Sequence, residues 1–132
     1  MITRSVRDAV SVRTEQVLKR FNRVFLTHDP SDLPDLVADD CIIENTAPAP
    51  DGSRHEGREA CIALWTQIAT MRGAHFEPES VVAHGDIGFI RWRLVWGSAV
   101  TELVRGVNLV QVRAGKIVAA QGYTLISDRV KK

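Results

Sequence analysis

The side chains that could carry acid–base chemistry are few, and they follow no metal or phosphate motif. Asn108 lies in the middle of an expected strand, where the backbone hydrogen bonds are already taken, so its amide is free for a ligand. Glu102 shares the strand parity of Asn108, and His55 precedes the third expected helix. A carboxylate or an imidazole can move a proton. The other histidines stand at turns or strand ends, where a solvated position is the simplest interpretation: His28, His75 and His84.

The composition indicates an ordinary globular chain without a polyanion-binding surface. Its 132 residues favour a single domain spanning residues 1–132. The 17 basic and 16 acidic residues give a net charge of +1, which provides no broad attraction for nucleic acid. Cys41 and Cys61 are too few for a disulfide framework or a metal quartet, and we interpret both as small buried hydrophobes.

The N-terminal segment indicates neither a secretion signal nor a membrane anchor. Charged residues interrupt the first ten positions, where a signal peptide would carry its apolar region. No apolar run approaches the roughly 18 residues that a membrane-spanning helix needs. We therefore expect a soluble, cytoplasmic protein without membrane or nucleic-acid partners, and a loosely ordered extension over residues 1–9.

Hydrophobic periodicity predicts helices in the first half of the chain and strands in the second. The strongest helix runs from Val10 to Thr27, and Pro30 follows it. Pro78 within an expected strand predicts an edge or a bulge. The remaining elements are a short helix through Val37, a strand over Cys41–Thr46, a loop over Ala47–Ser53, a helix from Arg58 to about Met71, and strands over His75–Ala83 and Phe89–Trp96.

The last third of the chain predicts a long hairpin. Two apolar-rich runs within Leu103–Ile126 are joined by a turn at Arg113–Lys116. Gly115 can take the left-handed conformation that a three-residue hairpin loop needs. Helices followed by consecutive strands predict an α+β fold, with the helices packed on one face of an antiparallel sheet.

Three motifs, in this order and spacing, resemble one known superfamily. Leu33–Glu44 contains an Asp-Asp pair and enters an apolar strand, His55–Ala60 begins a helix, and Arg105–Val118 forms the closing hairpin. Together they resemble the nuclear-transport-factor-2-like superfamily (NTF2-like), and within it the SnoaL-like and ketosteroid-isomerase-like proteins. The resemblance implies a cone-shaped fold. A strongly bent antiparallel or mixed sheet wraps three N-terminal-side helices, and a pocket opens between sheet and helices.

The resemblance also implies a homodimer through the outer face of the sheet. Apolar groups on an otherwise solvated sheet face suit burial against a second copy. That face is expected to carry Arg91, Arg93, Val95, Val107, Leu109, Gln111 and Tyr123.

The catalytic acids of the known relatives are absent at the matching positions. Asn45 stands where ketosteroid isomerases have their aspartate base, and an amide cannot accept a proton from carbon at neutral pH. Phe21 and Asn108 match the tyrosine and the protonated aspartate of their oxyanion hole. Gly122 matches an aspartate of the limonene-epoxide hydrolases, and the acid of the SnoaL-like cyclases has no clear replacement.

The implied pocket is apolar and nearly neutral, and it suits a small, flat or greasy molecule. The tryptophans could equally fill the core, and Asn45 could be a buried amide satisfied by the backbone. The expected ligand-binding residues are Phe21, Phe25, Asn45, Trp65, Trp92, Trp96, Asn108, Gly122 and Thr124.

Three functions remain open at this point. In a SnoaL-like enzyme acting on an apolar carbonyl or polyketide-like ligand, Asn108 would polarise an oxygen while His55 or Glu102 moves the proton, without metal or organic cofactor. In a non-catalytic binding module, the same pocket would only hold its ligand. In a dimeric scaffold, side chains would fill the cone and leave no cavity for a ligand.

Overall fold

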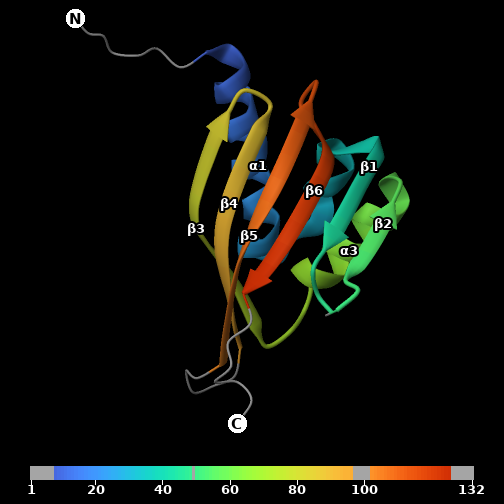
Figure 1. The fold of residues 1–132 in the computed structure, drawn as a ribbon, viewed down its shortest axis with the longest axis vertical. Helices are drawn as coiled ribbons and strands as arrows, with labels where there is room; N and C mark the ends of the chain where they lie inside the picture. The colour runs from blue at the N-terminus through green and yellow to red at the C-terminus, as the bar shows by residue number, and fades with distance from the viewer. Residues whose placement is uncertain (1–7, 49, 97–101, 126–132) are drawn as a thin grey trace, which may run out of the picture.

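The computed structural model describes residues 8–48, 50–96 and 102–125, apart from the side chains of Trp96, Glu102 and Leu103. Figure 1 shows a curved sheet with the longer helices behind it, which confirms the predicted α+β arrangement. The elements in chain order are α1 (Ala9–Thr27), the 3-10 turn η1 (Pro30–Asp32), α2 (Leu33–Leu36), β1 (Val37–Asn45), β2 (Ser53–Glu56), α3 (Arg58–Ala69), β3 (Ala74–His84), β4 (Ile87–Trp96), β5 (Glu102–Arg113) and β6 (Lys116–Leu125).

Helix α1 begins and ends with local hydrogen bonds that its sequence provides. The Asp8 carboxylate accepts a hydrogen bond from the backbone N–H of Ser11 at 2.7 Å, and this bond lowers the pKa of Asp8. At the other end His28 takes the left-handed conformation, with φ 56°, and its N–H bonds to the carbonyl of Val24. Between the caps, one stripe of α1 is buried against the sheet.

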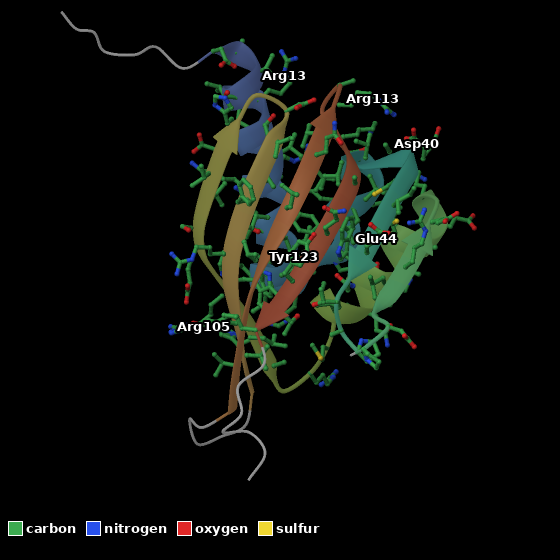
Figure 2. All side chains as sticks on the ribbon, in the orientation of Figure 1. Arg13, Asp40, Glu44, Arg105, Arg113 and Tyr123 are labelled. Atoms are coloured by element: carbon green, nitrogen blue, oxygen red, sulfur yellow. The ribbon has the colours of Figure 1, made fainter. Side chains whose placement is uncertain are left out.

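The sheet is mixed, with the strand order β2-β1-β6-β5-β4-β3. Neighbouring strands are antiparallel except β1 and β6, which run parallel. The guanidinium of Arg113, in the upper part of Figure 2, donates to the carboxylate of Asp40 at 2.9 Å and holds its pKa below the ordinary value. This contact ties the end of β5 to β1 across β6. Strand β3 lies at the edge, and its register shifts between Pro78 and Ser80, as the proline predicts.

Three local expectations were wrong. The short helix ends at Leu36, and β1 begins at Val37 rather than at Cys41. The segment before α3 contains the edge strand β2, whose polar sequence carries no hydrophobic alternation and which forms by pairing with β1. The closing hairpin has a two-residue loop, because both Ala114 and Gly115 have positive φ and Arg113 pairs with Lys116.

The core fills the space between the inner stripe of α1, the buried side of α3 and the sheet. Cys41 and Cys61 are free and buried in it, as expected. Burial raises the pKa of both thiols, so they stay protonated and pack as apolar groups. The described helices include none that is long and apolar enough to cross a membrane.

Two leucines of α1 provide a matched test of this packing. Leu18 is fully buried and Leu26 is 51% exposed. We expect Leu18→Ala to lower the free energy of unfolding by about 2–5 kcal/mol, because it leaves a cavity under the sheet. Leu26→Ala should change it by no more than about 0.5 kcal/mol. Urea unfolding of both variants measures the difference, and equal losses would contradict this placement of α1.

Candidate functional site

The inner face of the sheet carries a row of four residues in direct register. Asn45 of β1, Gly122 of β6, Asn108 of β5 and Ile90 of β4 are successive cross-strand partners. Ile90 is fully buried in the core, which identifies this face as the one turned toward the helices. The row therefore places two amides on the inner face, as strand parity predicts.

The two amides converge on Gly122, because that residue has no side chain. A Cβ atom built on Gly122 would lie 2.5 Å from Oδ1 of Asn45 and 3.0 Å from Oδ1 of Asn108. With contacts this short, a larger residue at this position would force the two amide side chains to move. Gly122, which sequence comparison had placed at a lost catalytic acid, instead permits the close approach of Asn45 and Asn108.

Trp92 orients the amide of Asn108. The indole N–H of Trp92 donates a hydrogen bond to Oδ1 of Asn108 at 3.1 Å. Because an indole N–H can only donate, the oxygen of Asn108 must face Trp92. Its NH₂ group is therefore turned away from Trp92, and this group can donate to the oxygen of a ligand. Asn45, Trp92 and Asn108 are all half-buried rather than sealed.

A connected series of aromatic rings fills the space deeper inside. Phe21 contacts Trp65 edge-on at a centroid distance of 4.7 Å, and it contacts Phe25 at 4.9 Å. Phe76 continues the series, at 5.1 Å from Phe25 and 5.6 Å from Trp92. Phe21, Phe25 and Trp65 are no more than 5% exposed, so these three predicted lining residues pack as core in this structure.

A hollow of about 250 Å³ lies beside Gly106, on the outer face of the sheet. Most of its lining residues have the strand parity of that face: Arg91, Arg105, Val107, Tyr123 and Leu125. A side chain at Gly106 would overlap the ring of Trp92 and meet the carbonyl of Tyr123 at 2.6 Å, so the glycine accommodates the Trp92 ring. Trp92 and Thr124, both predicted to contact a ligand, line the hollow.

Glu79 also lines this hollow, and the sequence analysis missed it. Its carboxylate lies 3.8 Å from Arg91, 3.8 Å from Arg93 and 4.0 Å from Arg105. Glu79 occupies the irregularity that follows Pro78, where regular strand parity no longer predicts which way a side chain points. In the sequence, Pro78 was the one indication that the side chain of Glu79 would depart from regular strand parity.

The two expected proton carriers lie far from Asn108 along the sheet. His55 belongs to β2, three strands from β5, which corresponds to about 14 Å across the sheet. Glu102 lies six residues from Asn108 on β5, about 20 Å along an extended strand. The side chains of Glu102 and Trp96 are outside the described part. Among the described residues, no three histidine, cysteine, aspartate or glutamate side chains are grouped to hold a metal ion.

Gly122→Ala tests the convergence of the two amides. The added methyl group should push Asn45 and Asn108 apart, displace their side-chain NH₂ resonances in ¹H–¹⁵N spectra and destabilise the fold by about 1–3 kcal/mol. Gln121→Ala is the control, because the Gln121 amide bonds to Glu44 on the opposite face. Unchanged Asn45 and Asn108 resonances in Gly122→Ala would refute the close approach.

Comparison with known proteins identifies the family. The model of the SnoaL-like domain matches residues 18–120. An NTF2-like protein of unknown function from Mesorhizobium loti is 48% identical, with a TM-score of 0.85 over 92% of this chain and 98% of its own. No curated protein matches.

Two more distant structures share the fold alone. A candidate ketosteroid isomerase from Kribbella flavida is 15% identical, with a TM-score of 0.75 over 89% of this chain and 81% of its own. A candidate SnoaL-like polyketide cyclase from Jannaschia sp. CCS1 is 14% identical, with a TM-score of 0.73 over 97% and 94% of the two chains. With a family match over most of its length and a close NTF2-like relative, this chain belongs to the SnoaL-like domain family of NTF2-like fold.

Proposed function

We propose that this domain binds a small, mostly apolar molecule through one carbonyl or hydroxyl oxygen. The observation that supports this most strongly is the hydrogen bond from Trp92 to Asn108. This bond turns the NH₂ group of Asn108 away from Trp92, so that the group can donate to a ligand on the inner face. The ligand oxygen accepts from Asn108, with Asn45 beside it across Gly122. Its apolar body lies on the inner face, beside the ring of Trp92.

A cofactor-independent acid–base enzyme is the second candidate. It is favoured by the two structural neighbours whose descriptions name an isomerase and a cyclase. Asn108 polarises the ligand carbonyl, while His55 or Glu102 moves the proton. Because both groups lie well away from Asn108 on the sheet, this reaction requires a ligand that extends along the inner face, as a polyketide-like chain would.

Acetophenone and ethylbenzene test whether Asn108 recognises an oxygen. We expect acetophenone to shift the indole N–H resonance of Trp92 and to bind more tightly than ethylbenzene. Asn108→Leu should weaken acetophenone binding about tenfold, the equivalent of one hydrogen bond, and leave ethylbenzene binding unchanged. Gln121→Leu, on the opposite face, is the control. Equal binding of both probes to the unsubstituted protein would refute the proposal.

We also propose a homodimer through the outer face of the sheet. Figure 2 shows this face toward the viewer, with Tyr123 labelled. Phe89 and Tyr123 are each 46% exposed, and Phe89 pairs across the strands with Val82 and Leu109 on the same face. Exposed aromatic and aliphatic groups in one continuous patch are typical of a surface that a second copy covers.

Phe89→Asp tests this interface. A charge in the middle of the apolar patch should convert the dimer into a monomer in sedimentation analysis, because the carboxylate would be buried without a partner. Leu26→Asp is the matched control, since Leu26 is equally exposed but lies on α1. The proposal would be refuted if the unsubstituted protein sedimented as a monomer at about 100 µM. This concentration, of order 10⁻⁴ M, is well above the dissociation constants of typical protein dimers.

A further inference from the structure

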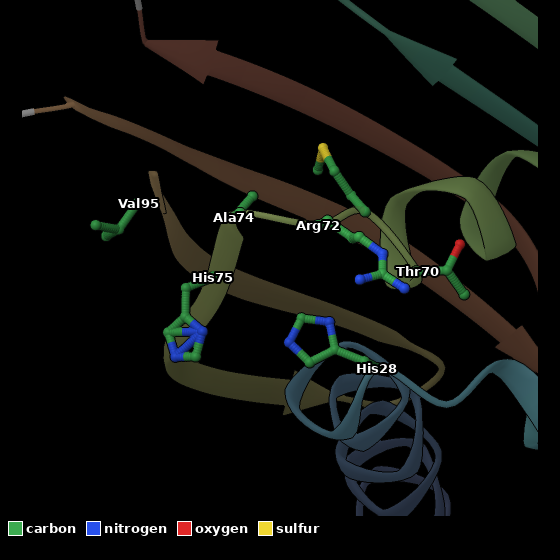
Figure 3. A pocket seen from close by; sticks show the side chains of 8 residues that line it. His28, Thr70, Arg72, Ala74, His75 and Val95 are labelled. Carbon is green, nitrogen blue, oxygen red and sulfur yellow. The ribbon is translucent and has the colours of Figure 1, made fainter. Parts of the chain in front are cut away.

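A second and larger hollow lies where α1 and α3 end and β3 begins. Its volume is about 700 Å³, and it shares no residue with the amide row or with the hollow beside Trp92. Figure 3 shows side chains from these separate elements around one space. The lining residues are His28, Thr70, Met71, Arg72, Gly73, Ala74, His75 and Val95.

The titratable groups that line this hollow are basic, and the lining includes no acidic side chain from the part of the chain that the structure describes. His28 caps α1, Arg72 lies between α3 and β3, and His75 is the second residue of β3. Among the described residues, the side chains of Arg72 and His75 have no ion pair or hydrogen-bond partner, and the ring of His75 lies near the ring of His28. The hydroxyl of Thr70 is already used, since it donates to the carbonyl of Thr66 at 2.7 Å.

His28 is held in a defined orientation toward this space. Its Nδ1 lies 2.9 Å from the carbonyl oxygen of Ala69, and a carbonyl can only accept, so Nδ1 carries a hydrogen. The other ring nitrogen, Nε2, is left for a different partner. The ring centroids of His28 and His75 are 6.2 Å apart, and Figure 3 shows His28 between His75 and Arg72. A ligand in the hollow therefore meets ring or guanidinium nitrogens from three residues.

This arrangement favours an anion over a metal ion. A guanidinium is always charged and cannot bind a metal, so Arg72 repels a cation from the two imidazoles. Its planar N–H groups match the two oxygens of a carboxylate. When protonated at Nε2, His28 adds a further donor. Met71, Ala74 and Val95 form the remaining walls and offer contact to an apolar body.

We propose that this hollow binds the carboxylate of a small organic acid with an apolar body, with Arg72 as the main pairing group and His28 and His75 as additional donors. The site is independent of the proposed oxygen-binding site at Asn108. Either site can therefore exist without the other, and loss of binding at one does not affect the test of the other.

Titration of the full chain with hexanoate tests the proposal, monitored by ¹H–¹⁵N spectra of the Arg72 side chain and the histidine rings. We expect hexanoate to shift these resonances, while hexan-1-ol and inorganic phosphate bind at least about tenfold more weakly, since one lacks the charge and the other the apolar body. Arg72→Gln should weaken hexanoate binding about tenfold, the equivalent of one charged hydrogen bond. The affinity of Arg72→Lys for hexanoate should fall between those of the unsubstituted protein and Arg72→Gln, because lysine keeps the charge and loses the planar donor pair.

Arg13→Gln is the matched control, because Arg13 lies on the first turns of α1, far from its His28 end (Figure 2). It should bind hexanoate as the unsubstituted protein does. Three results would overturn the proposal: unchanged hexanoate binding in Arg72→Gln, an equal loss in Arg13→Gln, or phosphate binding as tight as hexanoate binding. Zn²⁺ that shifts His28 and His75 while hexanoate shifts neither would identify a cation site and would also overturn it.

Discussion

The burial of one sheet face by α1 and α3, through a continuous series of aromatic rings, is the constraint on which the rest of the structure depends. Phe21 links the two helices in this series, in contact with Phe25 on its own helix and with Trp65 on α3. Phe76 carries the contact on to Trp92 in the sheet. Because close-packed rings leave little free space between them, the position of one ring constrains the next. The location of Trp92 over the amide row is thus set from inside the core.

The inner face consequently has two regions with different properties. The deeper region is sealed by Phe21, Phe25 and Trp65, and it provides stability. The shallower region holds Asn45 and Asn108, which are only half-buried. Rigid packing beneath a partly open polar group is what ligand recognition needs, since the donor is held in place before the ligand arrives.

The sequence predicted the features that depend on hydrophobic periodicity and strand parity. It did not predict the features that depend on pairing between distant segments. The α+β class, α1, the strand edge at Pro78 and the inward direction of Asn108 all follow from local patterns. Strand β2 could not be foreseen, because its polar residues are ordered only by β1. Glu79 was missed because it lies in the irregularity after Pro78. The hollow around Arg72 joins separate segments whose proximity no local pattern encodes.

The parallel pairing of β1 with β6 has a consequence for how the chain assembles. Until residues 116–125 are available, the only strand beside β1 in the part of the chain that the structure describes is the four-residue β2. One hydrogen-bonding edge of β1 therefore stays unpaired until the last strand forms, and the closing contact joins segments such as Val37 and Ile117, about 80 residues apart. Contacts at such separation slow folding, since a long loop must close before they stabilise the structure. A ribosome-bound chain lacking β6 would expose the edge of β1 to chaperones or to other nascent chains.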